Sequence, residues 1–226
     1  MKVISVAAPC NGSGKTSLIL AILKAFPGVF SAAKFTTIYR EERFCPLGDH
    51  DCACHRLDGQ YTICTDPEVL SQPDTDTGKI WRAGAKQTLW CIARIEGYPE
   101  MLKDLSARYL DDRTLLLIEG NTVIHYLPAH LRLFVVNPFL PRSWWKGDSE
   151  DFLDKADFVI VDTHTPQAMV SAGRPGRVDW FVRSVLSRVN AKQVAMENLE
   201  RLDQWADERL YEAISTIAKE DHEKPN

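Results

Sequence analysis

The sequence predicts an α/β fold of three layers, in which a mostly parallel sheet carries helices on both faces. Two observations lead to this fold class. Runs of consecutive apolar residues, without the alternation of a half-exposed strand, recur at 2–8, 114–119, 131–136 and 158–161. Such runs are typical of parallel strands buried on both faces. Segments with apolar residues at helical spacing separate some of these runs, and this alternation is typical of α/β architecture.

The chain opens with a strand, a tight turn and a helix. The apolar run 2–8 predicts a buried strand. Apolar residues at helical spacing from Gly14 to Phe26 predict a helix, which Pro27-Gly28 ends. Residues 29–37 predict a second strand.

The next segment, 38–79, lacks any long periodic stretch and is expected to be irregular. An irregular segment of this length in a compact domain is usually functional or disordered. Its cysteine, histidine and aromatic residues argue against simple disorder. We therefore expect a functional insertion at about 40–79 that carries cysteine and histidine residues.

The remaining chain predicts further helices and strands, followed by a linker. Helices are expected at 80–95, ending at Gly97, and from Pro99 to about Tyr109. Gly and Pro residues at 167–175 indicate a linker, and 176–220 is expected to be largely helical. These boundaries divide the chain into an α/β domain at 1–166 and a mainly helical C-terminal extension at 167–226.

Composition limits the possible partners. The formal net charge is -4 and no long basic run occurs, which argues against nucleic acid as a partner. No run of about 18 apolar residues exists, so no membrane span is expected. The first apolar run leads into a glycine-rich loop without a cleavage pattern, so we expect no signal peptide and a cytoplasmic protein.

Residues 9–16 carry the most specific motif of the chain. They match the P-loop pattern G-x-x-x-x-G-K-[ST], except that Pro9 stands in place of the first glycine. Inward-pointing backbone N–H groups and the N-terminus of the following helix would bind phosphates. The motif assigns Lys15 to the β- and γ-phosphates and the Thr16 hydroxyl to Mg²⁺. The predicted nucleotide-binding residues are Asn11, Gly12, Ser13, Gly14, Lys15, Thr16 and Ser17. The α/β domain is thus expected to be a P-loop nucleoside triphosphatase.

Two further motifs carry a resemblance to a known family. Asp74-Thr-Asp-Thr-Gly-Lys79 with Arg82-Ala-Gly-Ala85, and the Leu-Ile-Glu-Gly segment 117–120, resemble segments of MobB. MobB proteins are GTP-binding accessory proteins of molybdopterin-guanine dinucleotide biosynthesis, and dethiobiotin synthetases belong to the same P-loop branch. The resemblance covers roughly residues 1–162.

The resemblance implies roles for three acidic or amide side chains. Asp76 and Glu119 would converge on Mg²⁺ beside Thr16, and with Lys15 they form the expected catalytic group. Asn137 would hydrogen-bond the purine, although Asn137-Pro138 is equally compatible with a turn. Asp162, at the end of the run 158–161, either faces the same edge of the sheet or caps a turn.

The function implied is that of an accessory protein in metal-cofactor biosynthesis, of the molybdenum type, that binds and slowly hydrolyses GTP or ATP. A protein partner or a homodimer is expected. Two alternatives remain open. One is an ATP-dependent ligase of the dethiobiotin-synthetase type, which a small-molecule pocket beside the γ-phosphate would favour. The other is a metal-binding or metal-delivery protein that is gated by nucleotide.

The six cysteines include three within residues 45–54; His50 lies among these three, and His55 directly follows Cys54. Thiolate and imidazole are ligands that suit Zn²⁺. The spacing makes a zinc or iron–sulfur site one hypothesis; free cysteines and a Cys52–Cys54 redox pair are the alternatives. The candidate ligands are Cys45, His50, Cys52, Cys54 and His55.

Overall fold

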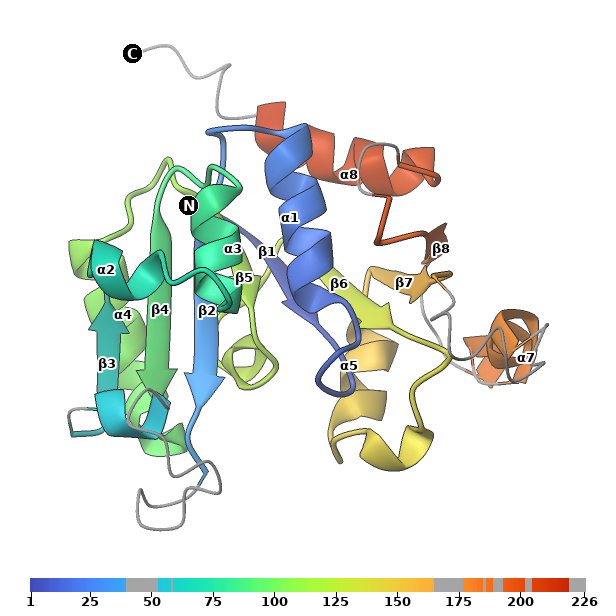
Figure 1. The fold of residues 1–226 in the computed structure, drawn as a ribbon, viewed down its shortest axis with the longest axis horizontal. Helices are drawn as coiled ribbons and strands as arrows, with labels where there is room; N and C mark the ends of the chain where they lie inside the picture. The colour runs from blue at the N-terminus through green and yellow to red at the C-terminus, as the bar shows by residue number, and fades with distance from the viewer. Residues whose placement is uncertain are drawn as a thin grey trace.

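The computed structural model describes residues 1–39, 53–57, 59–164, 177–184, 186–188, 193–201 and 205–219. It confirms the α/β fold with a mostly parallel sheet (Figure 1). Within the described residues the sheet has eight strands in the order β3-β4-β2-β5-β1-β6-β7-β8. Neighbouring strands are parallel except β3 and β4, which are antiparallel.

The strands are short and mostly buried. Their bounds are β1 Lys2–Ala7, β2 Ser31–Thr37, β3 Tyr61–Cys64, β4 Thr88–Ala93, β5 Leu115–Glu119, β6 Leu131–Val136, β7 Phe158–Asp162 and β8 Gln193–Glu197. The α-helices are α1 Lys15–Ala25, α2 Pro67–Leu70, α3 Asp76–Arg82, α4 Tyr98–Arg108, α5 Ser149–Lys155, α7 Arg177–Ser184 and α8 Glu208–Lys219. Single 3₁₀ turns lie at Ala53–Arg56, Ile95–Gly97, Thr122–His125, Arg142–Trp144 and Leu186–Arg188.

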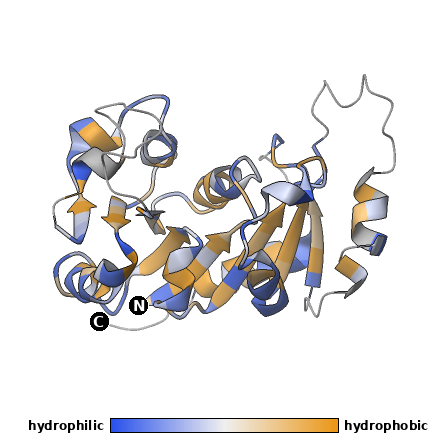
Figure 2. Ribbon diagram, turned by 90° about the horizontal axis from the view of Figure 1, so that it is seen from below, coloured by the Kyte–Doolittle hydropathy of each residue, from blue (hydrophilic) through white to orange (hydrophobic). Residues whose placement is uncertain are grey.

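The central strands consist mostly of apolar residues, as the orange ribbons in Figure 2 show, and these residues join cores on both faces of the sheet. Ile4 and Val6 of β1 join the core under α1, α3 and α8. Val3 joins the core under α4, and Ala7 the core under α5 and α7. Alternate residues of one strand therefore enter opposite layers, which is why the run 2–8 shows no polar alternation.

The helix expected at 80–95 is wrong beyond its first residues. The helix α3 ends at Arg82, Gly84 takes a left-handed φ of 81°, and the chain then enters β4. The strand pairs with β2 on one side and β3 on the other. Tertiary pairing decides between strand and helix for such a short apolar run. The helix expected from Pro99 is confirmed as α4.

The segment expected to be irregular is regular in part. The strand β3 pairs antiparallel with β4, and α2 and the start of α3 follow it before residue 79. Residues 40–52 and 58 lie outside the described residues.

The C-terminal segment contains the expected helices α7 and α8, and also a strand that was not expected. The strand β8 pairs parallel with β7 at the edge of the main sheet. Leu199, Leu210 and Ile214 pack into the same core as α1. The segment thus shares a sheet and a core with the preceding residues. Within the described part of the chain, no helix combines the length and apolar character that a membrane crossing needs.

Candidate functional site

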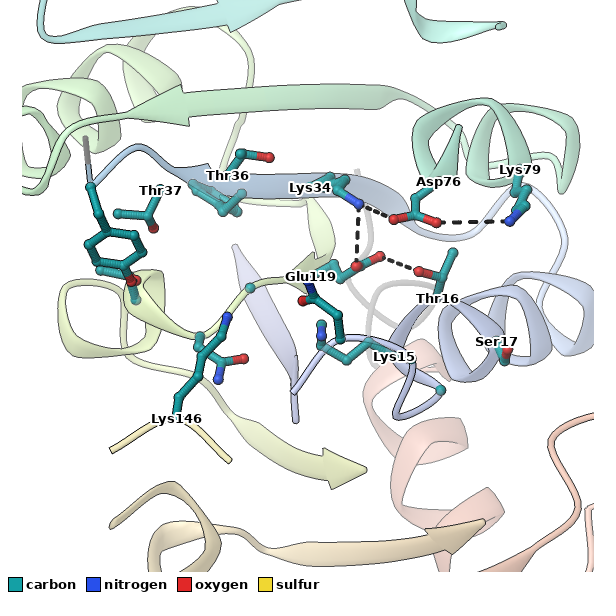
Figure 3. Close-up of a pocket in the computed structure, with 18 residues that line it drawn as sticks. Lys15, Thr16, Ser17, Lys34, Thr36, Thr37, Asp76, Lys79, Glu119 and Lys146 are labelled. Atoms are coloured by element: carbon teal, nitrogen blue, oxygen red, sulfur yellow. Dashed lines mark hydrogen bonds and ion pairs between the residues drawn. The ribbon is translucent and has the colours of Figure 1, made fainter. Parts of the chain in front are cut away.

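A pocket of about 640 Å³ opens where the parallel strands β1, β2 and β5 end (Figure 3). This is the edge of an open α/β sheet where ligands usually bind. The lining residues come from the P-loop, the ends of β2 and β5, the start of α3 and the loop after β6. They are Asn11, Gly12, Gly14, Lys15, Thr16, Ser17, Lys34, Phe35, Thr36, Thr37, Tyr39, Asp76, Lys79, Glu119, Gly120, Asn121, Thr122 and Lys146.

The P-loop has the backbone of a phosphate-binding turn. Gly12 and Gly14 take left-handed φ values of 76° and 101°, which glycine adopts without steric cost. The helix α1 starts at Lys15, so its N-terminus faces the pocket. Packing behind the loop leaves no room for a side chain at Gly14, because a Cβ atom there would lie 2.6 Å from Leu199 Cδ1.

Pro9, which replaces the usual glycine, anchors the entry of the loop. Its carbonyl oxygen accepts a hydrogen bond from the Lys146 backbone N–H at 2.9 Å and one from the Ser149 hydroxyl at 3.3 Å. Ser13, a predicted ligand, is buried and donates to the Cys10 carbonyl oxygen at 2.9 Å. Its side chain therefore stabilises the loop and does not line the pocket.

Lys15 lies in a crowded and partly desolvated position. Burial lowers the pKa of its ammonium group, the charges of Lys146 and Lys34 lower it further, and Glu119 opposes the shift. An anionic ligand beside the ammonium group would raise this pKa again, because a negative charge stabilises the protonated form. The surroundings of Lys15 therefore favour the binding of an anion.

Thr16, Glu119, Lys34 and Asp76 form one connected network (Figure 3). The Thr16 hydroxyl donates to Glu119 Oε2 at 3.0 Å. Lys34 Nζ donates to Asp76 Oδ2 and lies 3.6 Å from Glu119 Oε1. Lys79 Nζ lies 3.9 Å from Asp76 Oδ1. The motif residues predicted to converge, Thr16, Asp76 and Glu119, are therefore brought together in one pocket.

Asp76 owes its position to the cap of α3. The Thr75 hydroxyl accepts a hydrogen bond from Gly78 N at 2.9 Å, which starts the helix at Asp76. Gly78 is required there, since a Cβ atom would lie 1.8 Å from Gln72 O. Burial alone would raise the pKa of Asp76, but the hydrogen bond and charge of Lys34, with Lys79, lower it. The lowered pKa means that the Asp76 carboxylate carries its negative charge at neutral pH, and a negative charge favours the binding of a cation.

These side chains fit a magnesium ion. Mg²⁺ prefers oxygen ligands, keeps several waters and needs one or two carboxylates. Thr16 Oγ1, Glu119 and Asp76 supply a hydroxyl and two carboxylates at one end of the pocket. The carboxylates already attract a cation, because the ammonium group of Lys34 lies against both.

Lys34, Lys79 and Lys146 line the pocket and were missed by the sequence analysis. The signal for Lys34 was available: it is the one charged residue within the otherwise uncharged strand segment 29–37. Lys79 lies in the Asp74–Lys79 motif. Lys146 follows two tryptophans in a loop, and nothing in the sequence points to it.

Asn121 was also missed, and it joins the ends of two strands. Its side-chain amide donates to Ala8 O at 2.7 Å and accepts from Ala8 N at 3.3 Å. Gly120 allows the approach of β5 to β2, since a Cβ atom would lie 2.9 Å from Phe35 Cβ. These contacts fix Glu119 relative to the P-loop.

Asn137 and Asp162 are not among the described residues that line this pocket. Asn137 Oδ1 accepts from Phe139 N at 2.9 Å, and its amide donates to Asp162 Oδ2 at 3.4 Å. Asp162 Oδ1 accepts from His164 N at 3.0 Å and Leu199 N at 3.3 Å, and burial raises its pKa. Both side chains therefore hydrogen-bond to the segments that follow β6, β7 and β8. The purine contact of Asn137 stays a prediction.

Most candidate ligands of the metal site predicted for the cysteine-rich segment are not among the described residues. Cys45, His50 and Cys52 lie outside the described residues, and only the backbone of Cys54 and His55 is described. Among the described cysteines, Cys10 and Cys91 are buried, and burial raises the pKa of Cys91. The zinc or iron–sulfur site stays a prediction.

No protein-family model matches the chain, and no curated protein matches its sequence. Among solved structures, the hydrogenase maturation factor HypB of Archaeoglobus fulgidus superposes with a TM-score of 0.50 and 15% identity, over 96% of this chain and 90% of that chain. The chain therefore shares its α/β fold with that protein.

Two other solved structures are similar at lower scores. HypB of Helicobacter pylori, solved in complex with nickel, has a TM-score of 0.45 and 16% identity over 99% of this chain and 88% of that chain. LpxK of Aquifex aeolicus, solved with ATP, has a TM-score of 0.41 and 13% identity over 92% of this chain and 75% of that chain. Similarity at these identities concerns the fold alone.

Proposed function

We propose that this chain binds a nucleoside triphosphate together with Mg²⁺ and hydrolyses it slowly. One observation carries the proposal: the Thr16 hydroxyl and the Glu119 and Asp76 carboxylates meet in the pocket that the P-loop lines. A glycine-rich turn alone would not require two carboxylates from distant segments beside its threonine.

Each group of the site has a role in this proposal. The backbone N–H groups of the P-loop and the N-terminus of α1 bind the β-phosphate. Lys15 neutralises charge on the β- and γ-phosphates. Thr16, Asp76 and Glu119 hold Mg²⁺, which supplies further charge neutralisation around the γ-phosphate when bound. Lys34 lies against both carboxylates and keeps them in place before the ion arrives.

The same geometry supports slow turnover. Activation of water needs a base within hydrogen-bond reach. Asp76 and Glu119 are engaged with Lys34 and Thr16, and no histidine lines the pocket among the described residues. A protein partner or a second copy of the chain would then accelerate the reaction. The choice between GTP and ATP depends on the resemblance to MobB, which favours GTP.

For the biological role we propose an accessory protein of metal-cofactor biosynthesis in the cytoplasm. The motifs around Asp76 and Glu119 resemble those of the MobB family, which acts on the molybdenum cofactor. The fold is shared with a protein described as a hydrogenase maturation factor. A zinc or iron–sulfur site in the cysteine-rich segment would fit this role.

Calorimetric titration tests the nucleotide site. We expect Mg²⁺-GTP and Mg²⁺-ATP to bind the wild-type protein. Lys15→Ala should weaken binding tenfold or more, about 1.4 kcal/mol or above. The control is Lys24→Ala, which removes an exposed lysine near the other end of the same helix. Equal affinity of the Lys15→Ala and Lys24→Ala proteins would refute the site.

A further inference from the structure

Lys146 brings to the pocket an ammonium group that no carboxylate neutralises in the described part of the chain. Lys34 and Lys79, which line the same pocket, both lie near the Asp76 carboxylate. Within the described residues, by contrast, no carboxylate lies within ion-pair distance of the Lys146 side chain, although that side chain lines the pocket too. The P-loop motif and the expected Mg²⁺ ligands assign no role to this charge.

The backbone of Lys146 is joined to the entry of the phosphate loop. Its N–H donates to Pro9 O at 2.9 Å, and the Ser149 hydroxyl, 140 positions after Pro9, donates to the same oxygen at 3.3 Å. The pyrrolidine ring of Pro9 restricts its φ angle, which gives this carbonyl group a defined direction. The anchor uses backbone and hydroxyl groups alone, so the Lys146 side chain is not needed for it.

Lys146 lies close enough to Lys15 for their charges to repel each other. The charge of Lys146 contributes to the lowered pKa of Lys15, which Glu119 opposes. In the view of Figure 3, Lys15 lies between Lys146 and Thr16. Two like charges in a partly desolvated pocket disfavour each other, and an anion bound beside both removes the penalty. The pair of ammonium groups therefore indicates an anion at this end of the pocket.

The position of Lys146 indicates which phosphate it would meet. Thr16 and the N-terminus of α1 lie at the end of the pocket that takes the β-phosphate and Mg²⁺ in the site proposed above. Lys15 spans the β- and γ-phosphates, and Lys146 lies on the other side of Lys15 from Thr16 (Figure 3). A terminal phosphate group carries a charge of about -1.5 to -2 at neutral pH, more than one ammonium group neutralises.

We propose that Lys146 is a further phosphate-binding residue, whose ammonium group donates charge-assisted hydrogen bonds to the γ-phosphate; this rests on the nucleotide binding proposed above. A nucleoside diphosphate lacks this phosphate and cannot make the contact. Lys146 therefore makes the site prefer a nucleoside triphosphate over the corresponding diphosphate. Hydrolysis of the γ-phosphate removes the contact and weakens the hold on the product.

Calorimetric titration of Lys146→Gln tests the proposal with Mg²⁺-GTP, Mg²⁺-ATP and the two diphosphates. Affinity for the triphosphate should fall about tenfold or more, which is about 1.4 kcal/mol or above, while affinity for the diphosphate should change less than about twofold. Lys146→Arg should restore most of the loss, because a guanidinium group also binds phosphate. The matched control is Lys103→Gln, which changes an exposed lysine on α4 outside the pocket.

Two outcomes of this titration would overturn the proposal. One is an unchanged triphosphate affinity in Lys146→Gln. The other is an equal loss for triphosphate and diphosphate, which a general disturbance of the loop would produce.

Acetylation of the wild-type protein gives a measurement that does not depend on the folding of a variant. Lys146 and Lys103 are both exposed, so an amine-reactive ester should modify both, and mass spectrometry measures each rate. Saturating Mg²⁺-triphosphate should slow the acetylation of Lys146 relative to Lys103, because a bound phosphate shields the ammonium group, whereas the diphosphate should leave the ratio unchanged. Equal rates at Lys146 with triphosphate and diphosphate contradict the contact.

The two proposals can fail separately. If Lys15→Ala loses nucleotide affinity and Lys146→Gln keeps it, the role of Lys146 is wrong and the nucleotide site stands. If no nucleotide binds the wild-type protein, both fall.

Discussion

The close packing of Leu199 against the P-loop yields the sharpest stability prediction. Gly14 takes a left-handed φ of 101°, and its missing Cβ atom would lie 2.6 Å from Leu199 Cδ1 and 3.3 Å from Val135 Cγ1. Leu199 follows β8, so these contacts join the C-terminal segment to the phosphate loop. Replacing Gly14 by alanine perturbs both the loop backbone and this contact.

The magnitude follows from the two parts. A left-handed conformation costs an alanine roughly 1–2 kcal/mol. Forcing a methyl group into a packed site costs about 1–3 kcal/mol more. Gly14→Ala should therefore reduce the free energy of unfolding by about 2–5 kcal/mol. Gly12→Ala isolates the backbone part, because Gly12 has a φ of 76° and no atom lies within 4 Å of its Cβ position. Gly147→Ala, with open space and no positive φ, is the control.

Urea unfolding followed by far-ultraviolet circular dichroism measures these differences. A double-mutant cycle with Leu199→Ala separates packing from backbone strain. Leu199→Ala alone should cost about 2–5 kcal/mol as a core truncation. The double variant should be more stable than additivity predicts, by about 1–3 kcal/mol, because the shortened side chain makes room for the methyl group. Additivity within about 0.5 kcal/mol would refute the contact between Leu199 and the loop.

Three other predictions concern charges and metals. Lys34→Met should lower the free energy of unfolding by about 1–3 kcal/mol, because it removes the ammonium group that both Glu119 and Asp76 contact and leaves the two carboxylates to repel each other. Urea unfolding should show that Mg²⁺ restores part of this loss, and equal losses with and without Mg²⁺ contradict it. The pKa of Asp76 is lowered from 3.8, so its contribution to stability is complete above pH 3.8 and is lost as pH falls through the lowered value. Asp76→Asn should therefore flatten the fall in stability below pH 3.8, and an unchanged acid limb in urea titrations would disprove the ion pair with Lys34. Elemental analysis of untagged protein should find zinc or iron, and the Cys52→Ser, Cys54→Ser double variant should lack it. A closed structural site would hold nearly one equivalent of metal. Less than about 0.2 equivalents in the wild-type protein therefore contradicts the metal hypothesis.

The sequence by itself determined the fold class and the phosphate-binding end of the site. Apolar runs without alternation occur where strands are buried on both faces, so β1, β5, β6 and β7 were visible without coordinates. The P-loop motif binds mainly through its backbone, and consecutive residues determine that conformation. This is why the motif places Lys15 and Thr16 from a stretch of eight residues. Asp76 and Glu119 came from resemblance, since they lie 43 positions apart in the printed sequence.

Only the tertiary structure decided which distant residues share the pocket. Lys34 reaches the site because β2 lies beside β5, and Asn121 because its amide joins the end of β5 to the end of β1. Strands β4 and β8 escaped prediction because a five- or six-residue apolar run is a strand only where neighbours offer hydrogen bonds, and those neighbours come from other parts of the chain. A few consecutive residues determine the backbone turn of the P-loop. The set of side chains that meets in the pocket depends on which strands are neighbours in the sheet.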